Sequence, residues 1–283
     1  MTTLLLETYK MKIGLKARFS DLDGVLALKP ELIELHFSDK DPDYKFNPPK
    51  KIPIPCMIHL PEIWNGNLID AGNIKSENQV LPLRESRHVL QDVITKSEKF
   101  FKHFNNTKNF FILHPGGMTF ERDYPKNNKL RMEALLETLS MLKTNNSEIL
   151  VENLPPFPWY FGGQWNTNYF MDAQEIKEFC DKTGRKICFD TSHSKLYCNY
   201  AKKDFNKEVN LIKVYMQHLQ VADAKGLDIE GVQIDEGEID FGKFFKIIKD
   251  YDEFVVNEVW QGFLNDFAGF KIAMERIRNY LRK

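Results

Sequence analysis

Short, nearly continuous apolar runs recur along the chain, and stretches with helical spacing of apolar positions follow most of them. The runs have the length and composition of parallel strands that are buried on both faces of a sheet. We expect eight strands, over residues 12–18, 32–37, 55–60, 109–114, 148–153, 186–191, 215–222 and 253–260. The helical patterns predict helices over residues 86–104, 128–143, 172–183, 204–214, 240–251 and 266–281.

Strand and helix alternate along the sequence, which predicts parallel strands joined by right-handed crossovers. Because eight strands occur in 283 residues without an evident linker, we predict one α/β domain, a (β/α)8 TIM barrel, over residues 1–283. The early half is irregular, since the proline-rich residues 38–55 are unsuited to a full helix and residues 21–30 have room only for a short one. Long loops are expected at residues 61–82 and 155–171, over the carboxyl ends of strands three and five.

Side chains that commonly bind metals stand at the carboxyl ends of the apolar runs. They are His59, His114, Glu152, Asp190, His193, His218 and Glu258. Ionisable groups at the ends of buried strands are costly unless they are paired or bind a cation, and the strand ends of a barrel share one rim. We therefore predict a metal site at this rim, although each residue could instead be an isolated polar group with its own hydrogen bond. His36, His88 and His103 carry less weight in this pattern.

The composition narrows the classes of ligand and partner. Carboxylate and imidazole ligands without a CxxC pair suit one divalent ion (Mn²⁺, Mg²⁺, Co²⁺, Zn²⁺ or Fe²⁺) and disfavour a structural zinc site. The net charge of −1 disfavours nucleic acid as a partner. The start, MTTLLLETYK, lacks the features of a signal peptide, and no run reaches membrane-spanning length, so we expect a reduced, cytoplasmic protein without a membrane contact.

Several motifs resemble those of the xylose isomerase-like barrel superfamily, which contains sugar isomerases and epimerases, inosose dehydratases and endonuclease IV-type AP endonucleases. The matching segments are ENLP at 152–155, FDTSH at 189–193, VADAKG at 221–226 after His218, EGEIDF at 236–241, and Glu258. The resemblance covers nearly the whole chain and is clearest from Ile112 onward. These motifs are typical of the superfamily, but they do not specify one activity within it.

The resemblance implies that Glu152, Asp190, His218 and Glu258 hold the metal ion. It also implies that Glu152 and Glu258 act as an acid/base pair, which moves a proton at a carbon next to a carbonyl while the metal stabilises the enediolate. His193 would then face the substrate or a second metal and is a third candidate catalytic residue. The leading hypothesis is thus an isomerase or epimerase of a sugar, sugar phosphate or polyol; a dehydratase or a non-catalytic barrel that binds a sugar or a partner remains an alternative.

The outer histidines decide between sugar chemistry and phosphodiester hydrolysis. In endonuclease IV-like enzymes, histidines that match His59, His114 and His193 bind additional zinc, whereas in sugar-processing members such a histidine can bind a substrate hydroxyl. The hydrolases carry an Asp-x-His pair after the seventh strand, where this chain has GLDIEGVQID. This departure disfavours hydrolysis.

Further residues are candidates for contact with a carbohydrate substrate. They are Lys225, Asn153, Trp64, Trp165 and Trp260. The lysine could neutralise an anionic group and the aromatic rings could stack on a sugar, but a surface lysine and a lid packed on itself are the plain alternatives. The sequence is compatible with a homo-oligomer and does not identify the substrate.

Overall fold

The computed structural model describes residues 10–75 and 77–282. The segment MTTLLLETYK, on which the expectation of no signal peptide rests, lies almost wholly outside the described residues. Eight parallel strands form a closed barrel in the order β1-β16-β13-β12-β8-β6-β3-β2. The predicted TIM barrel is therefore confirmed, and each predicted strand overlaps an observed one. The strands are β1 Lys12–Ala17, β2 Leu32–His36, β3 Cys56–His59, β6 Asn109–Leu113, β8 Ser147–Glu152, β12 Ile187–Asp190, β13 Met216–Val221 and β16 Phe254–Asn257.

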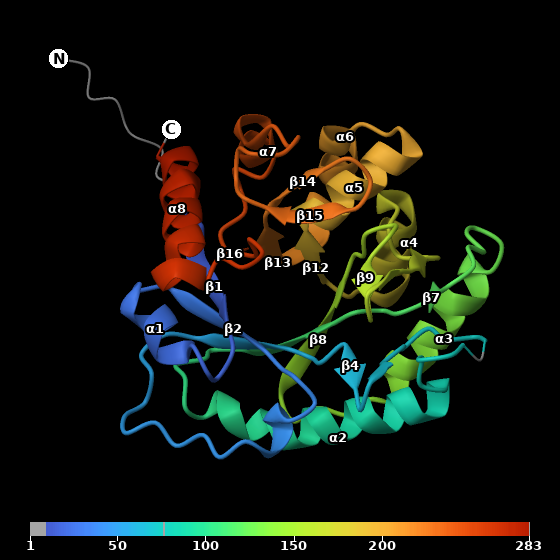
Figure 1. Ribbon diagram of the computed structural model, residues 1–283, viewed down its shortest axis with the longest axis horizontal. Coiled ribbons are helices and arrows are strands. Elements are labelled where there is room, and N and C mark those ends of the chain that lie inside the picture. The colour runs from blue at the N-terminus through green and yellow to red at the C-terminus, as the bar shows by residue number, and fades with distance from the viewer. Residues whose placement is uncertain (1–9, 76, 283) are drawn as a thin grey trace.

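Figure 1 shows the helices arranged around the strands, with α2 below them and α8 at the left. The helices are α1 Leu22–Ala27, α2 Leu83–Phe101, α3 Asn128–Met141, α4 Ala173–Thr183, α5 Thr191–Ala201, α6 Phe205–Ile212, α7 Phe241–Ile247 and α8 Leu264–Leu281. Helix α5 was not predicted, because it follows β12 without a loop. The segment after β2 contains only a 3-10 turn, Asp41–Asp43, as its prolines predicted.

Aspartates begin several of the helices and thereby place their first turns. Asp172, Asp204 and Asp240 each accept a hydrogen bond from a backbone N–H in the first turn of α4, α6 and α7, respectively. Gly184 ends α4 in the left-handed conformation, at φ 69°, as its position after the periodic run predicted. These caps satisfy N–H groups that the helix itself leaves without a partner.

Apolar side chains fill the deeper part of the barrel interior. They are Leu32, Met57, Phe110, Ile112, Leu150, Cys188 and Val256. Because alternate residues of a strand share a face, the residue two positions later on each strand also points inward. Two positions beyond Met57, Ile112, Leu150, Cys188 and Val256 stand His59, His114, Glu152, Asp190 and Glu258. A layer of ionisable groups therefore lies directly on an apolar layer.

Small hairpins cover the carboxyl ends of the barrel strands. After β3 comes β4 Ile63–Trp64 paired with β5 Asn67–Leu68, and after β8 comes β9 Trp159–Tyr160 paired with β10 Gly163–Gln164, then β11 Asn166–Thr167, which pairs with β7 Met118–Thr119. The two long predicted loops are thus present and carry short strands. A further hairpin, β14 Asp223–Lys225 with β15 Ile229–Val232, was not predicted.

The described chain has no helix that is both long enough and apolar enough to cross a membrane. All four cysteines are buried and none is in a disulfide. Cys188 packs in the apolar layer inside the barrel, where a thiol behaves as a small hydrophobic group.

Candidate active site

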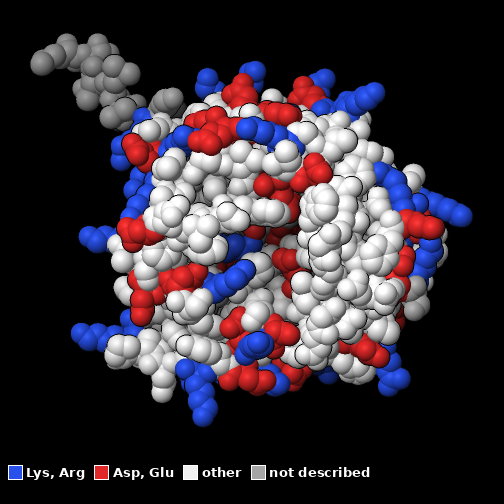
Figure 2. Space-filling view, in the orientation of Figure 1, with Lys and Arg blue, Asp and Glu red and all other residues white. Residues whose placement is uncertain are grey.

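A cavity of about 440 Å³ opens at the carboxyl ends of the barrel strands. Figure 2 shows a hollow in this face of the molecule, in which acidic and basic side chains gather. The polar groups that line the cavity are Lys16, Arg18, Asp21, His36, Glu62, Tyr160, His114, His193, Glu230, Glu258 and Gln261. Trp159, Trp260, Phe263 and Phe270 add aromatic surface to its wall.

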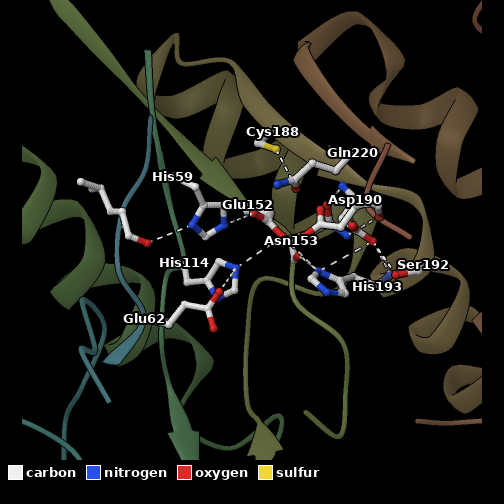
Figure 3. A network of polar contacts seen from close by, with 12 residues as sticks. His59, Glu62, His114, Glu152, Asn153, Cys188, Asp190, Ser192, His193 and Gln220 are labelled. Atoms are coloured by element: carbon white, nitrogen blue, oxygen red, sulfur yellow. Dashed lines mark hydrogen bonds and ion pairs between the residues drawn. The ribbon is translucent and has the colours of Figure 1, made fainter. Parts of the chain in front are cut away.

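Glu152, the last residue of β8, is fully buried and lies at the centre of a group of imidazoles. His59 Nε2 is 3.2 Å from its Oε2, His114 Nε2 is 3.4 Å from its Oε1, and His193 Nδ1 is 3.2 Å from its Oε1 (Figure 3). We call His59, His114, Glu152, Asp190 and His193 the histidine cluster. Residues from four strand ends thus meet at one point.

Backbone contacts fix the members of the histidine cluster. The Nδ1 of His59 donates to the carbonyl of Leu60 at 2.9 Å, and the Oδ1 of Asp190 caps α5 by accepting from the backbone N–H of His193 at 2.7 Å. His193 extends from α5, and its Nε2 lies 3.2 Å from Glu230 Oε2 on β15. The hairpin that the sequence did not predict therefore brings a further carboxylate to the site.

The histidine cluster has the donor set and the unsatisfied atoms of a metal site. Ligand atoms lie within 4.8 Å of one another in His36–His59–Glu62, in His59–His114–Glu152 and in Glu152–Asp190–His193. Among the described residues, Asp190 Oδ2 and His114 Nδ1 are buried without a hydrogen-bond partner. Because orphaned buried polar atoms are rare and costly, these residues fit a divalent cation bound by nitrogen and oxygen.

A second group of polar side chains occupies the β1, β2, β13 and β16 side of the cavity floor. The ammonium of Lys16 contacts Glu258 and lies 3.5 Å from Glu34 Oε1. Glu34 is fully buried; its Oε2 is 2.7 Å from His218 Nε2, and its Oε1 accepts from Gln220 Nε2 at 2.9 Å. We call Lys16, Glu34, His218, Gln220 and Glu258 the lysine cluster.

The charges of the lysine cluster act on one another strongly because the groups are buried. Burial alone raises the pKa of Glu34, but Lys16 and His218 outweigh it and lower that pKa to about 2. Burial opposes the charged form of Lys16, yet Glu258 and Glu34 hold its pKa well above the ordinary value. Burial raises the pKa of Glu258, and the ammonium of Lys16 opposes this change.

The imidazoles of the histidine cluster and the carboxylates around them also shift one another. Burial raises the pKa of Glu152, but His114 and the other two imidazoles outweigh it and hold it well below its usual range. Burial lowers the pKa of His193, yet Asp190, Glu152 and Glu230 raise it well above its ordinary value. Burial likewise raises the pKa of Glu62, but His114 and His36 outweigh it and lower the value to about 2.

The four ligands expected from the sequence are brought together only in part. Glu152 and Asp190 share a metal-capable group, whereas His218 and Glu258 belong to none of those found among the described residues. The strand register pairs His218 with Cys188 and Gln220 with Asp190. On β13 the residue beside Asp190 is therefore a glutamine rather than the expected histidine.

Only one of the five residues expected to bind substrate lines the cavity. Trp260 lies in its wall and is 55% exposed, whereas Trp165 is fully buried and donates from its indole to the carbonyl of Tyr160. Trp64 packs against the apolar core, and Lys225 is exposed on β14 outside the cavity lining. Trp165 belongs to a small apolar core with Leu68, Val80, Met118 and Leu154. Substrate contact by the tryptophans stays a prediction, and Trp260 is the one placed for it.

Asn153 does not point its side chain at the cavity but bonds to the backbone of the neighbouring strand. Its Nδ2 donates to the carbonyl of Asp190 at 3.0 Å, and its Oδ1 accepts from the backbone N–H of the same residue at 2.8 Å. The amide therefore links the ends of β8 and β12. This role fits the burial of Asn153, and its expected contact with a substrate stays a prediction.

Several ionisable residues at the site were not identified from the sequence. They include Lys16, Glu34, His36, Glu62, Tyr160 and Glu230. A signal did exist for Lys16 and Glu34, because each is a charged residue at an inward position of an apolar strand. His36 ends β2 with its ring 4.6 Å from that of His59, so the pattern of strand-end histidines extends to it.

Solved structures with the same fold include enzymes of different kinds. A D-tagatose 3-epimerase-like protein is 17% identical, with a TM-score of 0.63 over 96% of this chain and 97% of that one. Endonuclease IV from Thermus thermophilus is 14% identical, with a TM-score of 0.62 over 95% and 99%. The 3-keto-D-glucoside 4-epimerase YcjR from E. coli is 10% identical, with a TM-score of 0.64 over 95% and 99%. At these identities the likeness establishes the fold alone.

Sequence comparison connects the chain to a curated relative and to a family. The uncharacterized protein MJ1614 of Methanocaldococcus jannaschii is 26% identical over 179 residues, which are 60% of this chain, so the chain spans 61% of the length of that relative. The family model described as a xylose isomerase-like TIM barrel matches residues 85–280, which is more than half of the chain. Together with the closed barrel and its strand-end residues, this match shows that the chain belongs to the xylose isomerase-like TIM barrel family.

Proposed function

We propose that this protein is a divalent-metal-dependent isomerase or epimerase of a sugar, sugar phosphate or polyol. The observation that carries the proposal is the histidine cluster at the bottom of a cavity of about 440 Å³, whose wall carries aromatic rings. A cavity of this size suits a small molecule, and ionisable groups that converge on such a cavity are typical of an active site.

The metal ion would be held by the histidine cluster, with Glu152 between the imidazoles. An ion bound there would polarise a carbonyl oxygen and make the neighbouring C–H bond more acidic. The protein contributes by holding the ligands in place before the ion arrives, through the hydrogen bonds of His59 and Asp190 to nearby backbone groups.

Two groups that line the cavity are placed to move a proton. Among the described residues, Glu258 Oε2 has no hydrogen-bond partner while its other oxygen meets Lys16, so Oε2 can accept a proton from a substrate carbon. Glu152 suits a ligand better, since it is fully buried behind three imidazoles. The pair of His193 and Glu230 lines the cavity and takes the second proton-handling position in this proposal.

Exchange of substrate hydrogen with solvent tests this function directly. Incubation of candidate ketoses and aldoses with Mn²⁺ or Co²⁺ in D₂O should place deuterium at the carbon next to the carbonyl, as read by NMR. Glu258→Gln should reduce the exchange by about 100-fold or more, the scale of general acid/base catalysis. Glu148→Gln, a change at an exposed glutamate on the same strand as Glu152, is the matched control and should leave exchange unchanged. No exchange with any candidate in the presence of bound metal would refute the proposal.

One observation favours a metal-dependent phosphodiesterase as a second candidate. Two metal-capable groups share Glu152, and a bridging carboxylate between two ions is an arrangement that hydrolases use. Against it, four carboxylates, those of Asp21, Glu62, Glu230 and Glu258, outnumber the one lysine and one arginine in the cavity wall, which disfavours a phosphodiester backbone. Nicking of abasic DNA in the presence of Zn²⁺ would replace the first proposal with this one.

A further inference from the structure

The lysine cluster contains its own cation. Lys16 on β1 is the register partner of Glu34 on β2, and β1 lies between β2 and β16 in the barrel. On the other side Leu15 pairs with Asn257, so Glu258 follows at the level of Lys16. The ammonium therefore sits between two carboxylates that come from the two neighbouring strands.

We propose that Lys16 is a built-in cation of the cavity floor, whose ammonium occupies the place of a metal ion between Glu34 and Glu258. Metal binding is thereby confined to the histidine cluster, and Glu258 is left as a proton-transfer group rather than a ligand. The part that concerns the metal rests on the proposed function.

The hydrogen bonds of Glu34 show why this carboxylate does not require a metal ion to balance its charge. Both of its oxygens are engaged, Oε1 by Gln220 Nε2 and by the nearby ammonium of Lys16, and Oε2 by His218 Nε2. A fully buried carboxylate with this set of donors is already compensated. The other carboxylate beside Lys16, that of Glu258, keeps one oxygen, Oε2, without a hydrogen bond among the described residues, as does Asp190 Oδ2 in the histidine cluster.

Burial makes the charge of Lys16 effective. Its side chain is 14% exposed, that of Glu258 is 16% exposed and that of Glu34 is inaccessible, so solvent screens the three charges weakly. The two carboxylates hold the pKa of Lys16 well above its ordinary value against the effect of burial, which keeps the ammonium charged. A monovalent ammonium is enough here, because His218 and Gln220 supply the remaining donors to Glu34.

Lys16 is consequently a positioning residue for Glu258. It contacts Glu258 Oε1, while Glu258 Oε2 has no hydrogen bond among the described residues and the residue itself lines the cavity. Ligation of a divalent metal would instead lower the basicity of the carboxylate more than a monovalent ammonium does. The fixed lysine thus keeps one carboxylate available for chemistry beside a metal centre that uses other ligands.

Metal content of purified variants tests the inference. Each folded variant is loaded with Mn²⁺, freed of excess ion by gel filtration, and its metal content is measured by mass spectrometry. Lys16→Ala should bind one ion per chain more than the wild type. Lys16→Arg, which keeps the charge, and Lys12→Ala, a change at an exposed position of the same strand, should match the wild type.

The Glu258→Gln variant supplies the second arm. In the wild-type background it should leave the metal content unchanged, and in the Lys16→Ala background it should remove the extra ion. Should Lys16→Ala fail to fold, Lys16→Gln, which keeps a hydrogen bond to Glu258, replaces it with the same expectation. A folded Lys16→Ala or Lys16→Gln variant without an extra ion, or an ion lost from Glu258→Gln alone, would overturn the inference.

The outcomes separate this inference from the proposed function. A wild-type protein that binds no Mn²⁺ while Lys16→Ala binds one would contradict the proposed metal centre and support the role of Lys16. A wild-type protein that binds metal and loses an ion on Glu258→Gln would support the metal centre and contradict the role of Lys16.

Discussion

The two sides of the cavity floor are built from similar residues and behave differently. The histidine cluster and the lysine cluster each contain buried carboxylates and imidazoles at inward positions of barrel strands. In the lysine cluster the ammonium of Lys16, together with His218 and Gln220, satisfies Glu34 from within the protein. In the histidine cluster Asp190 Oδ2 and His114 Nδ1 are buried without a hydrogen bond among the described residues. The comparison teaches that residue type alone does not locate a metal site. Buried atoms without a partner occur on both sides, since Glu258 Oε2 and His218 Nδ1 also lack one among the described residues. What differs is that the lysine cluster already holds an ammonium between two carboxylates.

The largest expected effect falls on the centre of the histidine cluster. Glu152→Gln removes the charge that three imidazoles share, so the affinity for Mn²⁺ should fall by at least about 100-fold. Isothermal titration of the metal-free protein measures this change, and deuterium exchange into the substrate should fall with it. Glu148→Gln on the same strand serves as the control. An unchanged affinity would mean that the metal binds elsewhere.

The lysine cluster should respond in stability rather than in metal affinity. Glu34→Ala leaves the buried His218 without its carboxylate and Lys16 with only one of its two, and we expect the free energy of unfolding to fall by about 3–5 kcal/mol. Urea denaturation of the metal-free protein measures the loss, and Mn²⁺ titration of the folded variant should give the wild-type affinity. A loss of stability below about 1 kcal/mol would show that Glu34 does not balance the charges of Lys16 and His218 in the folded protein.

The pH dependence of stability provides a third comparison. The pKa of Glu34 is lowered from 4.5 to about 2 in the folded protein, so its charged form contributes stability above pH 4.5, and this contribution is lost as the pH falls toward 2. The shift corresponds to about 3 kcal/mol. The stability difference between the wild type and Glu34→Gln should therefore be larger near pH 6 than near pH 3, by denaturant unfolding without metal. A difference that grows on acidification would contradict the assignment.

A smaller effect on stability is expected at Tyr160, in the loop after β8 that carries several aromatic residues. The hydroxyl of Tyr160, on the β9–β10 hairpin, donates to Glu62 Oε2 at 2.8 Å. Tyr160→Phe should cost about 1–2 kcal/mol of stability, because it leaves a charged acceptor without one donor. Thermal unfolding measures this cost, and metal affinity should stay within twofold. If the free energy of metal binding changed by more than the free energy of unfolding, Tyr160 would act on the metal site rather than on stability alone.

The sequence predicted the barrel well because its strands are buried on both faces. Runs such as ICFD in β12 and FVVN in β16 are apolar at successive positions. This pattern is typical of parallel strands that are covered on both faces of the sheet. The short helix α1 and the irregular segment after β2 were also expected from the placement of prolines and the length available. Helix α5 was not predicted because Asp190 is both the last residue of β12 and the N-cap of α5. No loop sequence therefore separates the strand from the helix.

The site was predicted less completely, since contacts across the barrel depend on register. The strand-end pattern identified His59, His114 and Glu152, which the structure brings together, but it could not show that His218 lies level with Cys188. Lys16 and Glu34 are 18 positions apart and meet only because β1 and β2 pair in one register. The pattern of strand-end ligands did not identify Glu230, because the sequence of the β14–β15 hairpin does not resemble a strand strongly.

For the proposed metal site, the side chain of Asn153 has a consequence for which ions would fit. Its amide bonds to both the N–H and the carbonyl of Asp190, in the manner of one more rung of the sheet between β8 and β12. Glu152 and Asp190 are each the last residue of their strand, so the amide sets the spacing between them. A gap of fixed width discriminates among cations by ionic radius, because a larger ion cannot spread the two carboxylates without breaking that rung.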